Sequence, residues 1–263
     1  MSRASLKSVS RLIDIANDVK PIEEQFLTDL CRSIELDADK HWGIPSKTFK
    51  PSGMRCTRNN YYTLMGVEPD KGGSTHNNVG IVNSGSDIHD RMQTAISGMK
   101  ENGMDCEYVS VPDFIKSRNI ENLIIREQHG HETKLYNEKY NISFMLDGII
   151  KYKGKYYILE IKTETSNKWY SRDGVDKKHY NQAIAYSLNM GLDDVMFLYI
   201  DRDMLNKKSF IFHVTDKMRK EMVDYIENVN GYVERQVVPP KPSDLSKAVC
   251  SYCGYQSQCR KDG

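Results

Sequence analysis

Hydrophobic residues recur at helical intervals near both ends of the chain and alternate with polar residues in its middle part. Helical spacing runs from Leu6 to about Leu36, broken at Pro21, and predicts two helices joined at the proline. Capping side chains at 84–87 predict a helix that continues to about Lys100. Helical patterns also predict a short helix around 61–64 and longer ones over 177–189 and 216–235.

Short segments rich in β-branched and aromatic residues predict strands over 124–133, 142–152, 155–163, 195–200 and 209–215. Residues 43–53 and 67–83 are rich in Gly, Asn, Ser and Pro and predict loops. The order is helix, three strands, helix, two strands, helix. This order is typical of the α/β class with a mixed sheet flanked by helices. We expect a helical region over 1–50 and a main domain over 51–263.

Composition describes a soluble globular chain of 263 residues, with 39% hydrophobic and 28% charged residues. We find no apolar run long enough to span a membrane and no apolar signal core, so we expect a cytoplasmic protein. The net charge of +1 does not identify a nucleic-acid binder. The G-x-x-x-x-G-K-[ST] motif of P-loop ATPases does not occur in the sequence.

One predicted hairpin carries candidate chemistry. Its turn is expected at Lys153-Gly154, because glycine permits the positive φ that tight hairpins need. Counting outward pairs Tyr152 with Lys155 and then places Asp147 opposite Glu160. Opposed residues on one face have Cβ atoms about 5 Å apart.

Two carboxylates this close repel each other unless a proton or a cation lies between them. Carboxylate oxygens suit Mg²⁺ or Mn²⁺, and a metal-bound water loses its proton more easily. Lys162 lies two residues after Glu160 on the same face and could orient that water or stabilise charge on a phosphate. The pattern predicts phosphodiester hydrolysis; the alternative is an exposed hairpin with scattered charges.

The flanking residues resemble the PD-(D/E)xK nucleases of the RecB-like branch. The resemblance is carried by Asp147-Gly-Ile-Ile, by Leu159-Glu-Ile-Lys-Thr, by Gln182-Ala-Ile-Ala-Tyr186 and by Gly85-Ser-Asp-Ile-His89. It implies a restriction-endonuclease-like core in which the metal ligands are His89, Asp147, Glu160 and the backbone carbonyl of Ile161. It further implies that Lys162 is the catalytic lysine and that Gln182 and Tyr186 position the site or the DNA backbone. A further acidic residue often precedes the hairpin in these nucleases; Glu132 is the candidate for it, with Glu127 as the competitor.

The cysteines suggest a second metal site. Cys250, Cys253 and Cys259 form a C-x₂-C-x₅-C cluster, which lacks the second C-x₂-C pair of a zinc ribbon. One cysteine far upstream and three near the C-terminus resemble the iron–sulfur RecB-like nucleases, including Cas-four-type and AddB nuclease domains. The resemblance implies a 4Fe-4S cluster on these three and Cys56, acting as a staple; Zn²⁺ is the alternative.

The two remaining cysteines, Cys31 and Cys106, are expected to be small buried residues. Several basic residues could contact phosphates, and three nearby rings could stack on an unpaired base. The basic residues are Arg55, Arg58, Lys168, Arg172, Lys177 and Lys178, and the rings are those of Trp169, Tyr170 and His179.

The leading hypothesis is a DNA exonuclease acting on single strands or free ends in recombination, repair or phage DNA metabolism. It would work in the host cytoplasm if a phage encodes it. The N-terminal helices could bind a protein partner. The alternatives are an endonuclease on the same scaffold, a catalytically inactive DNA-binding module and a zinc-bound structural adaptor.

Overall fold

The structure is a computed structural model that describes residues 21–40, 46–70, 75–243 and 247–263. The chain divides into two compact units, Met1–Gly43 with Gly72–Val82 and Ile44–Lys71 with Asn83–Gly263. The first unit contains α2 (Ile22–Lys40), which is the predicted helix after Pro21. The helix predicted before Pro21 lies outside the described residues.

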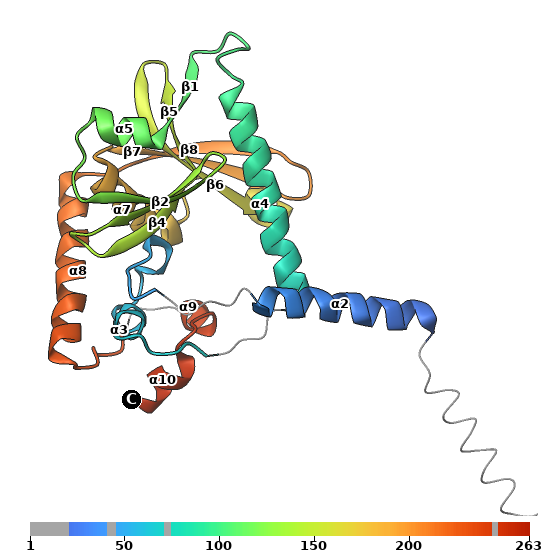
Figure 1. Cartoon of the computed structure of the whole chain (residues 1–263), viewed down its shortest axis with the longest axis vertical. Helices are drawn as coiled ribbons and strands as arrows, with labels where there is room; N and C mark the ends of the chain where they lie inside the picture. The colour runs from blue at the N-terminus through green and yellow to red at the C-terminus, as the bar shows by residue number, and fades with distance from the viewer. Residues whose placement is uncertain (1–20, 41–45, 71–74, 244–246) are drawn as a thin grey trace, which may run out of the picture. The chain divides into compact units, whose positions relative to one another are not determined.

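The second unit contains a five-stranded sheet in the order β1-β5-β6-β7-β8 (Figure 1). The strands are β1 (Cys106–Val109), β5 (Gly148–Tyr152), β6 (Lys155–Glu164), β7 (Asp194–Asp201) and β8 (Lys207–His213). The β6–β7 pair is parallel and the other pairs are antiparallel, so the predicted α/β class with a mixed sheet is confirmed. A second, three-stranded sheet consists of β2 (Leu123–His129), β3 (Glu132–Asn137) and β4 (Ile142–Leu146).

Helices cover both faces of the larger sheet. Ile158 of β6 and Phe197 of β7 pack in one core with α7 (Tyr180–Met190) and α8 (Asp216–Arg235). Leu159 and Ile161 point to the opposite face, where Ile88 of α4 (His76–Ser97) covers them. This alternation along β6 puts Glu160 and Lys162 on the α7 face.

Shorter helices complete the described chain. They are α3 (Thr57–Met65), α5 (Val111–Ser117), α6 (Ser166–Tyr170), α9 (Lys247–Ser251), α10 (Gln256–Lys261) and the 3₁₀ turns η1 (Pro51–Gly53) and η2 (Lys177–His179). The short helix predicted around 61–64 is α3, and the helix predicted over 177–189 is η2 followed by α7. No helix in the described part of the chain is both long and apolar enough to cross a membrane.

Three predicted boundaries are wrong. α4 begins at His76, so 76–83 is helical rather than loop, and the presumed capping residues at 84–87 lie inside the helix. The strand predicted over 124–133 turns back at Gly130, whose φ is 56°, and its last residues begin β3. The strand predicted over 142–152 is divided at Asp147 into β4 and β5, which belong to different sheets.

Candidate active site

The β5–β6 hairpin has the predicted register. Tyr152 pairs with Lys155 and Gly148 pairs with Leu159, so the next step along both strands puts Asp147 beside Glu160. The turn residues Lys153 and Gly154 both adopt the left-handed conformation, with φ of 48° and 79°. The position of Asp147 is fixed further by the Ile161 backbone N–H, which donates to Asp147 Oδ2 at 2.6 Å.

Glu160 is a buried carboxylate, and one of its two oxygens has no hydrogen-bond partner among the described residues. Lys162 Nζ contacts its Oε1, and Gln182 Nε2 donates to the same oxygen at 2.7 Å. Oε2 is buried and has no hydrogen-bond partner among the described residues. Burial and the charge of Asp147 raise the pKa of Glu160 to about 7. A divalent cation would satisfy the free oxygen and favour the ionised form of both carboxylates.

His89 and Glu132 complete an oxygen- and nitrogen-rich group with Asp147. One ligand atom of each lies within 4.8 Å of the other two. His89 Nδ1 is 3.4 Å from Asp147 Oδ1. Burial alone would lower the pKa of His89, but the contact with Asp147 and the charge of Glu160 outweigh it and raise the pKa. Glu127, the other acidic candidate, instead contacts Lys134 at 3.1 Å on the surface.

The helix α7 holds the site from the side opposite His89. Gln182 and Tyr186 are four residues apart and so face the same way. Gln182 Nε2 donates to the Tyr186 hydroxyl at 2.7 Å, and that hydroxyl donates to the Met145 carbonyl at 2.8 Å. The chain of bonds therefore runs from the Glu160 carboxylate to the backbone just before Asp147.

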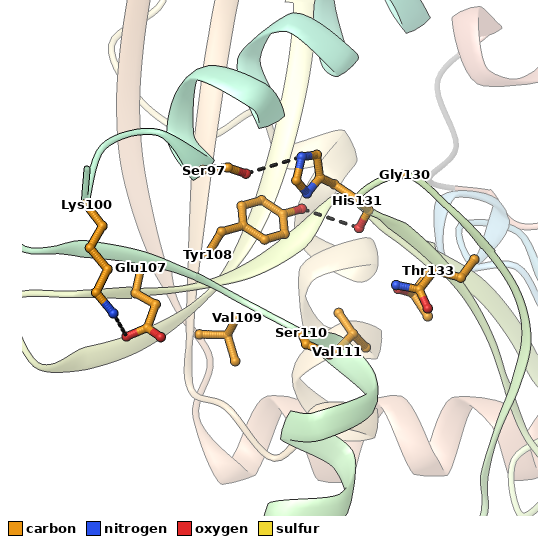
Figure 2. Close-up of a pocket in the computed structure, with 11 residues that line it drawn as sticks. Ser97, Lys100, Glu107, Tyr108, Val109, Ser110, Val111, Gly130, His131 and Thr133 are labelled. Atoms are coloured by element: carbon orange, nitrogen blue, oxygen red, sulfur yellow. Dashed lines mark hydrogen bonds and ion pairs between the residues drawn. The ribbon is translucent and has the colours of Figure 1, made fainter. Parts of the chain in front are cut away.

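Two further residues that the sequence did not suggest hold the Asp147 backbone. Gln93 Nε2 donates to the Asp147 carbonyl at 2.8 Å, and the Tyr108 hydroxyl donates to the same oxygen. Gln93 lies one helical turn after His89, and that spacing is the signal that could have identified it. Figure 2 shows Tyr108 beside His131 in a cavity of about 420 Å³, where His131 Nε2 lies 3.2 Å from Ser97 Oγ.

The four cysteines of the expected staple line one cavity of about 220 Å³. All four are free thiols. Two side chains of α3 direct N–H groups at sulfur: Arg58 lies 3.4 Å from Cys259 Sγ, and Asn59 lies 3.3 Å from Cys253 Sγ. Such donors stabilise a thiolate, which is the form that binds metal.

The two other cysteines differ in burial. Cys106 is buried as expected, with 3% of its surface exposed. Cys31 is only half-buried on α2, a helix without a buried residue, so that prediction is wrong.

Several basic and aromatic residues proposed for DNA contact instead form ion pairs within the protein or are buried in it. Arg172 and Lys168 both bind Glu164. Trp169 is buried and donates to the Tyr199 carbonyl at 3.1 Å. His179 is also buried, and burial together with the charges of Lys162 and Lys178 lowers its pKa to about 3. Tyr170 remains exposed.

No protein-family model matches the sequence, and no curated protein matches it. The fold is similar to that of SSO0001, at 17% identity and a TM-score of 0.48, over 89% of this chain and 96% of that one. It is also similar to LHK-Exo in complex with dAMP, at 11% identity and a TM-score of 0.37, over 73% and 90% of the two chains. A candidate exonuclease from Eubacterium rectale is 14% identical, with a TM-score of 0.33 over 78% and 88%. Likeness at these levels carries no function across to this chain.

Proposed function

We propose that the chain is a metal-dependent deoxyribonuclease of the PD-(D/E)xK type, acting as an exonuclease on single strands or free DNA ends. The observation that carries the proposal is the buried Oε2 of Glu160. This oxygen has no protein partner among the described residues, yet its carboxylate lies beside Asp147 and a lysine. Buried carboxylate oxygens are normally hydrogen-bonded, and a bound cation would supply the missing partner of this one.

The residues present fit a hard divalent cation. His89, Asp147 and Glu160 would hold it, with Glu132 and the Ile161 carbonyl as further ligands. When bound, Mg²⁺ or Mn²⁺ lowers the pKa of a water molecule and neutralises charge on the phosphate. The 4.8 Å grouping of the ligand atoms of His89, Glu132 and Asp147 is close enough for one ion.

The remaining residues would position the reacting groups and stabilise charge on the phosphate. The Lys162 side chain is 23% exposed, so its ammonium can reach a phosphate oxygen while it contacts Glu160. There it would orient the attacking water or stabilise the charge that develops on the phosphate. Gln182 and Tyr186 would keep the Glu160 carboxylate in a single orientation, because Gln182 donates to both Glu160 and the Tyr186 hydroxyl and both of these bonds are buried.

For the cysteine cavity we propose a 4Fe-4S cluster held by Cys56, Cys250, Cys253 and Cys259. A space of about 220 Å³ exceeds what a single ion fills, and N–H donors to the sulfurs are features of iron–sulfur sites. Zn²⁺ is the alternative. Anaerobically purified protein should be brown and contain iron; a colourless protein with one zinc per chain would replace the cluster by zinc.

The nuclease proposal is tested by digesting end-labelled single-stranded DNA, linear duplex and a closed circle, each with Mg²⁺, Mn²⁺ or EDTA. Wild type should degrade the linear substrates only with metal, and Lys162→Ala and Asp147→Ala should be inert. Cleavage of the circle would identify an endonuclease on the same scaffold. If cofactor-loaded wild type binds DNA and cuts none of the three, the chain is a DNA-binding module.

The cellular setting also remains a proposal. A nuclease of this kind would serve recombination, repair or phage DNA metabolism in the cytoplasm. The N-terminal region would bind a protein partner, since its helix α2 exposes the apolar side chains of Ile22, Phe26 and Leu30.

A further inference from the structure

A groove of about 630 Å³ extends from the proposed catalytic residues to the cysteine tail. Lys162 and Gln182 line its catalytic end, and Cys250, Tyr252 and Cys253 line its other end. Its volume lies within the range of sites that hold organic ligands, about 300–1,000 Å³. Whatever occupies the groove is therefore adjacent to the reacting phosphate.

The ordinarily charged side chains that line the groove are all basic. Arg55, Lys162 and Lys178 line it, and none of the described residues that line it is Asp or Glu. The chain as a whole has a net charge of only +1, so this concentration of cations is local. Cations gathered along one groove fit a polyanion whose phosphates follow it.

Lys178 in particular lacks a full counter-charge. Its pKa is lowered to about 8 by partial burial and by the neighbouring ammonium of Lys168. Asp176 lies 3.6 Å from Lys178 Nζ, but it also contacts Lys168 at 3.1 Å and Arg172 at 3.5 Å. With Glu164, which Lys168 and Arg172 also bind, two carboxylates serve three cations. A phosphate in the groove would supply the missing negative charge.

Tyr252 provides a flat surface at the far end. Its side chain is 92% exposed, although it stands between two cysteines whose positions a bound metal would fix. An exposed ring on an anchored loop is a platform for stacking, and only an unpaired base offers its face for that. Lys and Arg side chains can bind the phosphates of single- or double-stranded DNA, but an exposed tyrosine ring favours single-stranded DNA.

We propose that this groove binds single-stranded DNA, with phosphates at Arg55 and Lys178 and a base stacked on Tyr252. The assignment rests on the proposed nuclease function and extends it, because it states which strand form reaches the site and by which path. It also gives the cysteine tail a part in substrate binding, since Cys250, Tyr252 and Cys253 line the groove.

The test is fluorescence anisotropy with a labelled single-stranded oligonucleotide, in Ca²⁺, with gels confirming that the DNA stays intact. Tyr252→Ala should weaken binding about tenfold, while Tyr252→Phe keeps the ring and should bind like wild type. Tyr170→Ala is the matched control, because Tyr170 is also exposed but does not line the groove.

Lys178→Gln should weaken binding and reduce the slope of log K against log salt by about 0.7. Iron and zinc content must equal that of wild type in every variant.

Two outcomes overturn the proposal. One is wild-type affinity in both Tyr252→Ala and Lys178→Gln. The other is an equal loss of affinity for blunt duplex, which would make the groove a duplex site. Hydrolysis of bis(p-nitrophenyl) phosphate with Mn²⁺ separates this failure from failure of the nuclease function. That small diester does not span the groove, so wild type and Tyr170→Ala should hydrolyse it and Asp147→Ala should not. If wild type hydrolyses neither the diester nor DNA, the nuclease function fails instead.

Discussion

At the scale of single residues, Glu160 makes the metal-free site sensitive to pH. Its pKa is raised to about 7 by burial and by Asp147, and the pKa of His89 is also raised by its carboxylate neighbours. A raised pKa in the folded state means that the native protein holds protons that the unfolded chain releases. These protons therefore stabilise the folded state. Their contribution is complete below the ordinary carboxyl pKa of 4.5 and is lost as the pH rises through about 7.

We therefore expect the Tm measured in EDTA to fall by several degrees between about pH 5 and about pH 8, since about 1 kcal/mol shifts Tm by about 2–4 °C at this chain length. Glu160→Gln cannot ionise and should flatten the fall. Saturating Mg²⁺ or Mn²⁺ should flatten it in wild type, because the cation stabilises the charged form. Thermal scans across this range check the prediction, and an equal slope in wild type and Glu160→Gln would contradict it.

Gly148 permits a close approach of Tyr108 behind the proposed metal site. A β-carbon added there would collide with the Tyr108 hydroxyl, which also donates to the Asp147 carbonyl. Gly148→Ala should displace Asp147 and lower nuclease activity roughly 100-fold while the protein still folds. The control is Gly174→Ala, where an added β-carbon meets no atom within 4 Å. Rates on linear DNA and circular dichroism check both; equal activities would show that the site tolerates the displacement.

The core of the candidate site could be predicted from residue order because the hairpin is local. Counting from one turn was enough to bring Asp147 and Glu160 together and to align Lys162. Tyr108 could not be found this way, because it comes from a different strand and contacts Asp147 only through tertiary folding. The free oxygen of Glu160 is likewise a property of its packed surroundings.

At the scale of secondary-structure elements, the β5–β6 turn sets the register of the whole site. Both turn residues are left-handed, a conformation that suits Asn-Gly and is costly for lysine at the first position. Lys153→Asn should raise stability by up to about 1 kcal/mol, because its backbone bond to the Asp105 carbonyl remains. Gly154→Val should lower stability by at least about 1 kcal/mol. Urea unfolding checks the two opposite shifts, and a common direction would refute the turn assignment.

Elements with local signals were predictable and elements defined by distant partners were not. α8 agrees with its predicted bounds because it is strongly amphipathic and Thr215 caps it, accepting from the Met218 N–H at 3.3 Å. β1 has only four residues and exists by pairing with β5 far along the chain, so no local pattern marks it. The residues at 84–87 resemble a cap, but exposed helix positions tolerate the same side chains.

At the scale of the whole second unit, Arg58 connects α3 to the C-terminal tail. Its guanidinium donates to the carbonyls of Pro239 at 2.8 Å, Cys259 at 3.1 Å and Gly263 at 3.0 Å. The residue is 5% exposed. A planar fork can serve several acceptors at once, whereas a lysine ammonium cannot reproduce that geometry. One side chain thus holds the segment that carries three of the four proposed cofactor ligands.

Arg58→Lys should therefore loosen the tail without removing a charge or a cysteine. Because buried hydrogen bonds to a charged group contribute about 1.5–3 kcal/mol each, we expect limited trypsin digestion to cut the tail at least about tenfold faster. Iron or zinc should also be released faster to a chelator, because the ligands on the tail lose their anchor. Arg260→Lys is the control, an exposed arginine whose guanidinium lies 3.4 Å from Gln256 Oε1. If Arg58→Lys keeps wild-type protection and metal retention, the cysteines and their cofactor hold the tail alone, and the guanidinium serves only local packing.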